Sequence, residues 1–274
     1  MTTILDGKMV SAKMTDILKE KIKNFKILPK LVIILVGEDY SSKVYVNMKK
    51  KKCEEIGLSC DVLKFDESVS QREIEDTIIN LGKDENVAGI MIQHPMPAHI
   101  DEQACFNLIP FEKDVDGLSA QSFGFIAQKR EYFVPATALG VIKLIEEYNI
   151  DLVGKKVLVV GKSQIVGMPL TVMLLNRSAT VTVASRHTTN LPEIVKDFDI
   201  VIVAIGKPEY IKADWFKEGT VIIDVGYNKG CVGDIEKSAY EKASFVAPVP
   251  GGAGPMTIAC LLWQTVNAIE KLQK

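Results

Sequence analysis

The stretch from Lys155 to Pro169, KKVLVVGKSQIVGMP, constrains the fold more than any other part of the chain. Residues 157–160 form a short apolar run, mainly β-branched, which is typical of a buried parallel strand. Gly161 and Gly167 follow, and Pro169 stands where the first turn of a helix tolerates proline. A strand that leads through a glycine loop into a helix presents backbone N–H groups to an anion. The stretch therefore predicts a phosphate-binding loop, with an ordinary strand–helix turn as the alternative, because its spacing is not the three-glycine dinucleotide pattern.

Apolar runs alternate with helical patterns along the whole chain, which predicts an α/β fold of parallel sheets with helices on both faces. In the first half, strands are expected at residues 30–36, 59–65 and 87–92, and helices at 11–23, 42–56, 71–83 and 137–148. Pro95, Pro97 and Pro110 predict loops in between. In the second half, strands are expected at 157–160, 180–184, 200–205, 221–225 and 245–247. Five strands with helices between them match a doubly wound nucleotide-binding fold.

The 274 residues are enough for two domains. We expect an N-terminal α/β domain at 1–140 and a Rossmann-like domain with a doubly wound parallel sheet at 141–255, with a cleft between them. The last helix, at 256–274, carries an apolar face that needs a partner surface. We expect it to pack back on the first domain.

The overall composition excludes several classes of partner. Net charge is −2, with 25% charged and 47% hydrophobic residues, so no basic field invites nucleic acid or an anionic membrane. No apolar run is long enough to span a bilayer, and the N-terminus does not resemble a signal peptide. The five cysteines form no CxxC pair, which indicates reduced thiols in a cytoplasmic protein.

No metal site is expected. The histidines and cysteines lack the spacing of zinc ligands. Residues 112–117 fit the first half of a calcium loop, but the twelfth position would be Phe123 where a bidentate Glu is needed. The Asp-Gly pair at 116–117 therefore indicates a turn.

Arg186 stands just after the second expected strand of the nucleotide-binding domain, about 25 residues beyond Gly161. NAD enzymes usually place an acidic residue there for the ribose 2′-hydroxyl. A cation suits a 2′-phosphate, and Lys162 in the phosphate-binding loop is a second cation. The sequence thus favours NADP, with a solvated surface arginine as the alternative.

The helix expected at 42–56 carries four consecutive lysines, at 49–52. Consecutive helical positions are about 100° apart, so the four cannot all face solvent in the same direction. This geometry allows one of them to face a cleft, with a solvated basic face as the alternative, and spacing does not choose between Lys49 and Lys52. Gln93 directly follows the strand expected at 87–92, and in open α/β sheets ligands bind beyond the carboxyl ends of strands. An amide there can hold a lysine amine by a hydrogen bond.

Several motifs together resemble the bifunctional methylenetetrahydrofolate dehydrogenase/cyclohydrolase family. They occur over nearly the whole chain and in the same order: LDGK, YVNMK, IQHP, EKDVDGL, VVGKSQIVGMP, DVGYN, GDI and PVPGGAGPMT. EKDVDGL and PVPGGAGPMT are highly specific in combination. The last of these has three prolines and three glycines in ten residues, which predicts a stiff loop with open backbone.

The resemblance implies the oxidation of 5,10-methylenetetrahydrofolate with NADP⁺, followed by hydrolysis of the methenyl product to 10-formyltetrahydrofolate. It implies that Lys49 is the catalytic lysine and Gln93 its partner, and that the protein is a homodimer. For the folate, it implies that Tyr45 stacks on the substrate, that Asp116 binds the pterin, and that three loop residues line the folate site: Pro250, Gly251 and Gly254. The positions that contact NADP by resemblance are Gly161, Lys162, Ser163, Ile165, Gly206, Tyr227 and Thr257.

The sequence departs from the family pattern at four places. His94 follows Gln93 where leucine is usual, and a usual P-C-T-P is Pro135-Ala136-Thr137-Ala138. Lys162 stands where arginine is more common, and Arg186 where serine is common. The catalytic pair is intact.

Two other hypotheses fit the domain pattern. One is an NADP-dependent dehydrogenase of another small substrate, of the shikimate-dehydrogenase type, which does not account for Tyr45 or PVPGGAGPMT. The other is a nucleotide-sensing regulatory module without catalysis, which would need no reactive lysine.

Overall fold

The computed structural model describes residues 1–272, and the chain divides into two compact units. The six-stranded unit comprises Met1–Ala12, Ile126–Arg130 and Pro135–Cys260. The three-stranded unit comprises Lys13–Phe125, Glu131–Val134 and the residues from Leu261 onward. The domain limits expected at 140/141 and 255/256 remain predictions.

The six-stranded unit contains an all-parallel sheet with the strand order β1-β9-β8-β7-β5-β6. Its strands are β1 (Thr3–Ile4), β5 (Lys156–Val160), β6 (Thr180–Ala184), β7 (Ile200–Val203), β8 (Val221–Asp224) and β9 (Phe245–Ala247). The chain builds outward from β5 in both directions, so the order reverses between β5 and β7. This confirms the doubly wound parallel sheet, and such a reversal point is where open α/β sheets bind ligands.

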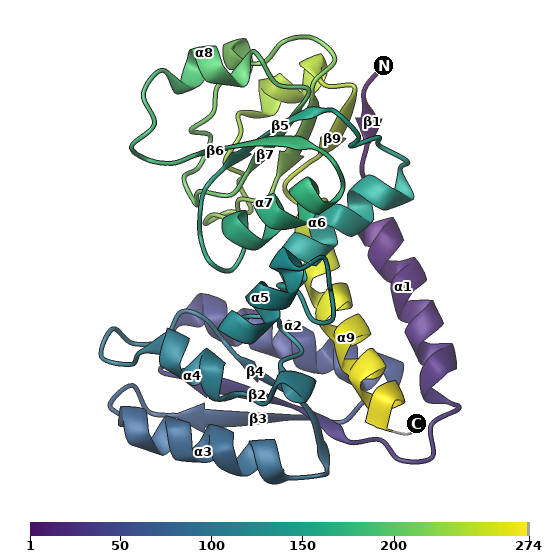
Figure 1. The fold of residues 1–274 in the computed structure, drawn as a ribbon, viewed down its shortest axis with the longest axis vertical. Helices are drawn as coiled ribbons and strands as arrows, with labels where there is room; N and C mark the ends of the chain where they lie inside the picture. The colour runs from purple at the N-terminus through teal and green to yellow at the C-terminus, as the bar shows by residue number, and fades with distance from the viewer. Residues whose placement is uncertain (273–274) are drawn as a thin grey trace. The chain divides into compact units, whose positions relative to one another are not determined.

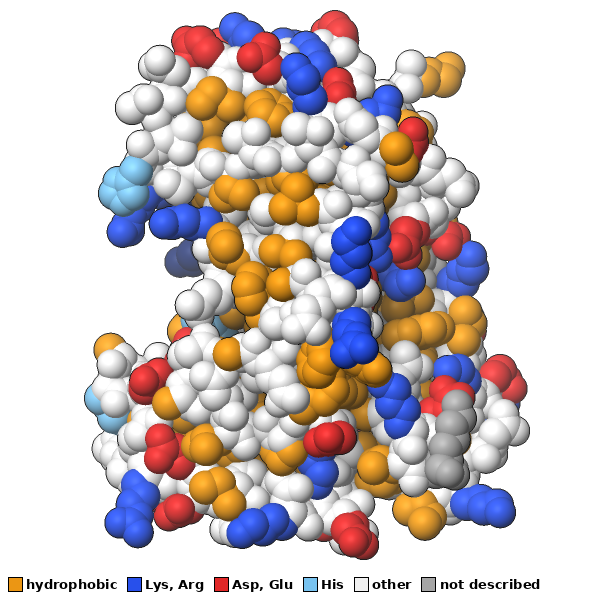
Figure 2. All heavy atoms as spheres, viewed as in Figure 1, with side chains coloured by type: hydrophobic (Ala, Val, Ile, Leu, Met, Phe, Trp, Pro, Cys, Tyr) orange, Lys and Arg blue, Asp and Glu red, His pale blue; other side chains and the backbone are white. Residues whose placement is uncertain are grey.

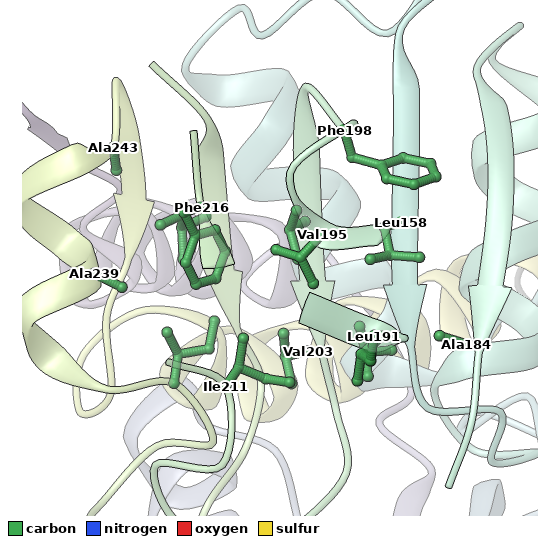
Figure 3. Close-up of a cluster of buried hydrophobic side chains, with 14 of the residues drawn as sticks. Leu158, Ala184, Leu191, Val195, Phe198, Val203, Ile211, Phe216, Ala239 and Ala243 are labelled. Atoms are coloured by element: carbon green, nitrogen blue, oxygen red, sulfur yellow. The ribbon is translucent and has the colours of Figure 1, made fainter. Parts of the chain in front are cut away.

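Helices cover both faces of this sheet. In Figure 1, α8 (Leu191–Val195) lies on one side of the strands, and α7 (Gly167–Asn176) and α6 (Ala136–Glu147) lie on the other. Figure 3 shows Leu191 and Val195 of α8 pointing toward Leu158 and Val203 of the strands. The same apolar cluster includes residues next to or within two 3-10 helices, η2 (Ala213–Trp215) and η3 (Lys237–Lys242).

The three-stranded unit is built on a parallel sheet with the order β3-β2-β4. Its elements are β2 (Lys30–Val36), α2 (Tyr40–Ile56), β3 (Cys60–Phe65), α3 (Gln71–Lys83), β4 (Val87–Ile92), α4 (Glu102–Leu108) and the 3-10 helix η1 (Phe111–Lys113). Strands β2 and β4 are buried along almost their whole length. One face packs in a cluster with α3 and α4. A central strand that is covered on both faces needs a continuous apolar run, as KLVIILV provides.

Three helices contribute residues to both units: α1 (Gly7–Ile22), α5 (Ala120–Ala127) and α9 (Ala253–Leu272). Helix α1 begins four residues before the expected start because the Asp6 carboxylate accepts the N–H groups of Lys8 and Met9, at 2.9 and 3.0 Å. This is an N-terminal cap. Helix α9 also begins early, at Ala253, with Pro255 in its first turn, where proline is tolerated. Residues 273–274 of the predicted last helix lie outside the described residues.

Other element predictions were incomplete. Strand β1 was not expected, and helices α4 and α5 lie where loops were predicted. Helix α4 forms despite the nearby prolines because the Asp101 carboxylate accepts the Ala104 N–H at 3.0 Å. Strand β7 ends at Val203, two residues before the expected end, because the N–H of Ile205 donates to a side-chain carboxylate, that of Asp234, at 2.7 Å.

The surface in Figure 2 mixes basic and acidic side chains over the face that is drawn. None of the helices within residues 1–272 is long and apolar enough to cross a membrane.

Candidate active site

Helix geometry places the four consecutive lysines of α2 in different environments. The buried face of α2 includes Val46, Lys49 and Cys53. Lys49 is only 6% exposed, although it is the first of four consecutive lysines. Lys52 lies at the surface, where its amine pairs with Glu55 at 2.7 Å. The structure thus places Lys49, and not Lys52, inside the three-stranded unit.

The amine of Lys49 has a neutral hydrogen-bond partner. Its Nζ donates to Oε1 of Gln93 at 2.8 Å and lies 3.4 Å from the thioether sulfur of Met91. Gln93 follows β4 directly, and its backbone N–H extends the sheet by donating to Ile34 at 2.8 Å. Its side-chain Nε2 donates to the carbonyl of His94 at 2.7 Å, which leaves the amide oxygen facing the lysine. Both ends of this buried amide are therefore satisfied.

Burial lowers the pKa of the Lys49 amine from its ordinary 10.5 to about 8. The negative charge of Asp116, followed by the thiols of Cys53 and Cys60, acts in the opposite direction but is outweighed. Desolvation disfavours the charged form of a buried amine, and Gln93 adds no counter-charge that would restore it. An amine with such a pKa exists in both protonation states near neutral pH, which suits proton transfer.

Asp116 lies in a turn that a second carboxylate shapes. Asp114 is fully buried, and it accepts the N–H groups of Leu118 and Ser119 and the hydroxyl of Ser122, at 3.2, 3.1 and 2.6 Å. Gly117 has φ +67°, and a Cβ there would lie 2.5 Å from the backbone of Val134. The turn therefore has little freedom, which fixes the backbone that carries Asp116. Tyr45 lies on α2, one turn before Lys49.

In the six-stranded unit, the predicted cofactor residues follow the carboxyl ends of parallel strands. Gly161 comes after β5, Arg186 after β6, Gly206 after β7 and Tyr227 after β8. The carboxyl ends of parallel strands lie at one edge of a sheet, so the topology brings these four positions to the same edge. Gly161 and Gly206 flank the reversal point between β5 and β7.

The loop after β5 has the geometry of an anion cradle. Gly161 has φ +119°, and a Cβ there would lie 2.2 Å from the carbonyl oxygen of Ala204. A Cβ at Gly167 would lie 2.0 Å from the carbonyl oxygen of Gly161. The hydroxyl of Ser163 accepts the Val166 N–H at 3.2 Å at the start of α7. Only glycines allow this close backbone approach, and it brings the loop directly to the N-terminus of α7, where the helix dipole favours an anion such as phosphate.

The cations are exposed at this edge of the unit. Lys162, Ser163 and Arg186 all lie at the surface, and Nε of Arg186 lies 3.1 Å from Nε2 of His187. Figure 2 shows basic side chains gathered beside a histidine at the left edge of the unit that contains β6. These residues fit a dinucleotide that carries an additional phosphate.

The remaining cofactor positions are more varied. Ile165 is half-buried in the loop before α7, and Tyr227 is 54% exposed, with its hydroxyl 3.5 Å from the sulfur of Cys231. Gly206 has φ +64° with open space around a notional Cβ. Thr257 lies on α9, where its hydroxyl donates to that of Thr137 at 3.2 Å.

The predicted folate residues are divided between the units. Tyr45 and Asp116 belong to the unit that contains Lys49, whereas 250–254 belong to the six-stranded unit and follow β9. Pro250 and Gly254 are exposed, and a Cβ at Gly254 would meet open space. Within residues 1–272, no group of three or more His, Cys, Asp and Glu side chains is arranged to hold a metal ion.

Sequence reasoning missed three residues that shape these sites: Met91 beside the lysine, Asp114 in the Asp116 turn, and Asp234 beside Gly206. For the two carboxylates a signal was present, because Asp114 belongs to EKDVDGL and Asp234 to GDI. Those motifs indicated family membership without indicating which backbone groups the side chains bind.

Two family models match the chain. The model described as the catalytic domain of tetrahydrofolate dehydrogenase/cyclohydrolase matches residues 5–116, and that of its NAD(P)-binding domain matches residues 135–273. A relative named bifunctional protein FolD, from Leptospira interrogans, is 47% identical over 98% of this chain and 96% of its own.

Solved structures of the same family also match this chain over its length. The bifunctional FolD enzyme from Campylobacter jejuni has a TM-score of 0.97 and 40% identity, covering 99% of this chain and 100% of that one. The Trypanosoma brucei dehydrogenase-cyclohydrolase, complexed with NADP cofactor and inhibitor, has a TM-score of 0.95 and 30% identity, covering 100% and 99%.

The shikimate-dehydrogenase hypothesis has a weaker basis. The enzyme from Aquifex aeolicus has a TM-score of 0.54 at 18% identity, covering 88% of this chain and 91% of that one, which shows a related fold alone. Two matched domain models and full-length relatives at up to 47% identity decide the assignment: the chain belongs to the tetrahydrofolate dehydrogenase/cyclohydrolase family.

Proposed function

We propose that this chain oxidises 5,10-methylenetetrahydrofolate to the methenyl cation with NADP⁺ and then hydrolyses that cation to 10-formyltetrahydrofolate, with Lys49 as the proton-transferring residue. The observation that carries the proposal is the buried amine of Lys49, 2.8 Å from the neutral amide oxygen of Gln93. It occurs in a chain that both domain models of the family match.

The oxidation requires that substrate and cofactor be held in a fixed orientation. NADP⁺, when bound, supplies the acceptor for the hydride that leaves the one-carbon bridge. The chain contributes the backbone of Gly161 and Gly206, the start of α7, and the cations Lys162 and Arg186 for the phosphates. Ser163, Ile165, Tyr227 and Thr257 complete the proposed binding residues. Holding two reactants in register removes much of the entropic barrier.

The hydrolysis requires a base for the attacking water and an acid for the ring nitrogen that departs. With a pKa of about 8, neutral Lys49 accepts a proton from water as the C–O bond forms. The resulting ammonium donates its proton to the nitrogen as the C–N bond breaks, and the hydroxyl added from water loses its proton to solvent as the formyl C=O forms. Gln93 holds the amine in both states, because its oxygen accepts from either form.

The folate is held by groups of complementary chemistry. The carboxylate of Asp116 accepts two parallel N–H bonds from the aminopyrimidinone edge of the pterin. Tyr45, one helical turn before Lys49, stacks on the substrate and sets its distance from the amine. Pro250, Gly251 and Gly254 supply a stiff backbone with little side-chain bulk, against which a flat ring can lie.

We further propose that the protein acts as a homodimer in the cytoplasm. The family resemblance implies the dimer, and the cysteine pattern supports a reducing compartment. In the proposed division, residues 1–140 with the last helix bind folate and residues 141–255 bind NADP.

Replacing the lysine tests the proton-transfer role. We expect Lys49→Met to reduce methenyl hydrolysis by about 10²–10⁴-fold, the usual contribution of general acid–base catalysis, while folate binding is retained. The decay of methenyltetrahydrofolate absorbance measures hydrolysis. The exposed neighbour provides the control, since Lys51→Met should hydrolyse at the wild-type rate. Normal hydrolysis by Lys49→Met would remove the lysine from the mechanism.

The same substitution should stabilise the fold. Below about pH 8, Lys49 is protonated in the folded and unfolded states alike, and burying the ammonium costs about 3 kcal/mol, the equivalent of lowering the pKa from 10.5 to about 8. Losing the bond to Gln93 costs about 1–2 kcal/mol. We therefore expect Lys49→Met to be about 1–2 kcal/mol more stable at pH 7 by urea unfolding.

The stability difference should depend on pH. Between pH 8 and 10.5 the unfolded wild type binds more protons than the folded one, so the free energy of unfolding of the wild type rises with pH. The advantage of Lys49→Met should shrink over that interval. An advantage that is constant from pH 7 to 10 would contradict the assigned pKa.

Asp116→Ala should mainly weaken folate binding. Two charge-assisted hydrogen bonds of about 1.5 kcal/mol or more each amount to about 3 kcal/mol, so their loss is expected to raise the folate dissociation constant about 100-fold or more. Isothermal titration with a folate analogue measures this, with the exposed Asp76→Ala as the control. An unchanged dissociation constant would exclude Asp116 from pterin binding.

Arg186→Ala should reduce the preference for NADP⁺ over NAD⁺ about tenfold, since it removes a cation from the 2′-phosphate. The ratio of kcat/KM for the two cofactors is the measurement, and Arg130→Ala removes an exposed arginine elsewhere in the same unit. If both variants keep the wild-type ratio, Arg186 is only a surface charge.

A further inference from the structure

Two fully buried carboxylates lie beside the loop that follows β7. Asp224 is the last residue of β8, and Asp234 follows a turn ten residues later; both are 0% exposed. They belong to the motifs DVGYN and GDI, in which Tyr227 is the residue assigned to cofactor binding. Buried carboxylates are costly unless their oxygens are hydrogen-bonded, so the partners of these two groups indicate what they hold.

Asp234 holds the backbone of the loop after β7. Its Oδ2 accepts the N–H groups of Ile205 and Gly206, at 2.7 and 2.9 Å. Its Oδ1 accepts the N–H of Lys207 at 2.8 Å and the amide of Asn228 at 3.0 Å. Three successive N–H groups therefore converge on one carboxylate. Without it they would either turn toward solvent or extend the strand.

Asp224 in turn holds the backbone around Asp234. Its Oδ1 accepts the N–H groups of Gly226 and Asp234, both at 3.0 Å. Its Oδ2 accepts the N–H of Ile235 at 3.0 Å and the hydroxyl of Tyr240 at 3.4 Å. Asp224 thus fixes the backbone that carries the Asp234 side chain.

The glycines of the two motifs make room for this arrangement. A Cβ at Gly226 would lie 2.1–2.5 Å from the carboxylate atoms of Asp234, and one at Gly233 would lie 2.0 Å from Oδ2 of Asp224. Each motif therefore supplies one carboxylate and the gap for the carboxylate of the other. Burial raises the pKa of Asp224 to about 6, with a smaller contribution from the charge of Asp234.

We propose that Asp234 is a positioning residue for the dinucleotide: it fixes the backbone of residues 205–207 at the reversal point of the sheet, so that the cofactor meets a preformed loop. Gly206 leaves this backbone open, since a notional Cβ there meets nothing within 4 Å. The proposal rests on the proposed function and deepens it. A loop that is ordered in advance does not have to be ordered by the ligand, which strengthens binding.

The two activities provide a readout that distinguishes positioning from general stability. Oxidation needs the cofactor, whereas hydrolysis of added methenyltetrahydrofolate does not. In Asp234→Asn, one acceptor oxygen becomes an NH₂ group that faces N–H donors. We expect Kd and KM for NADP⁺ to rise about 10–100-fold. We expect kcat at saturating NADP⁺ to change less than about threefold and cofactor-free hydrolysis less than about twofold.

Asp197→Asn is the matched control, because it makes the same change at an exposed position of the same unit and should leave every parameter at the wild-type value. A second variant, Asn228→Ala, removes one donor to Asp234 but leaves the three loop bonds. It should raise KM for NADP⁺ about threefold. If Asp234→Asn does not fold, the result for Asn228→Ala decides, and a wild-type KM there overturns the proposal.

Two results with Asp234→Asn would overturn the positioning role. One is an unchanged Kd for NADP⁺. The other is a loss of hydrolysis in parallel with oxidation, which would indicate a structural role alone. Direct titration of the protein with NADP⁺ keeps this test separate from the proposed function. If the wild type binds NADP⁺ but has neither activity, the proposed function fails while Asp234 is still tested.

Discussion

The burial of one amine against a neutral amide is the interaction on which the catalytic account depends. Lys49 lies on the buried face of α2, and Gln93 follows the C-terminal end of β4, with its side-chain oxygen within hydrogen-bonding distance of the lysine amine. Two rigid elements therefore set the distance between the two groups, and no loop has to close to form it. A carboxylate in place of the amide would return the amine to its charged form at neutral pH.

Both units use buried polar groups to hold backbone that is left without a regular partner. In the three-stranded unit, Asp114 holds the turn that carries Asp116. In the six-stranded unit, Asp234 holds the loop that contains Gly206. A carboxylate suits this task because each of its oxygens accepts two hydrogen bonds, and several N–H groups can converge on it. The residues proposed to contact ligands are thus held in place by buried side chains that do not have to contact a ligand themselves.

Much of the fold follows from local pattern. The apolar run before Gly161 predicted β5, which the structure confirms, and the glycines that follow it lie where backbone segments approach closely. The parallel sheet followed from strands that alternate with helices. These features could be predicted because burial on both faces requires continuous apolar runs, and close backbone contact requires glycine.

What could not be predicted depends on contacts between distant residues. Spacing did not choose between Lys49 and Lys52, since that choice depends on which side of α2 packs on the sheet. The early end of β7 follows from Asp234, 29 residues further along, which takes the N–H of Ile205. The first strand, β1, is two residues long and is defined by pairing with β9, a partner about 240 residues away.

The most direct test of the central claim is the titration of the Lys49 amine itself. NMR of protein labelled with ¹⁵N at lysine side chains follows each Nζ signal against pH, and the signal that disappears in Lys49→Met identifies the residue. A midpoint near pH 8 is expected for the Lys49 amine, well below its ordinary value of 10.5. A midpoint above pH 10 would show an amine that remains charged at neutral pH, and would contradict its role as a base.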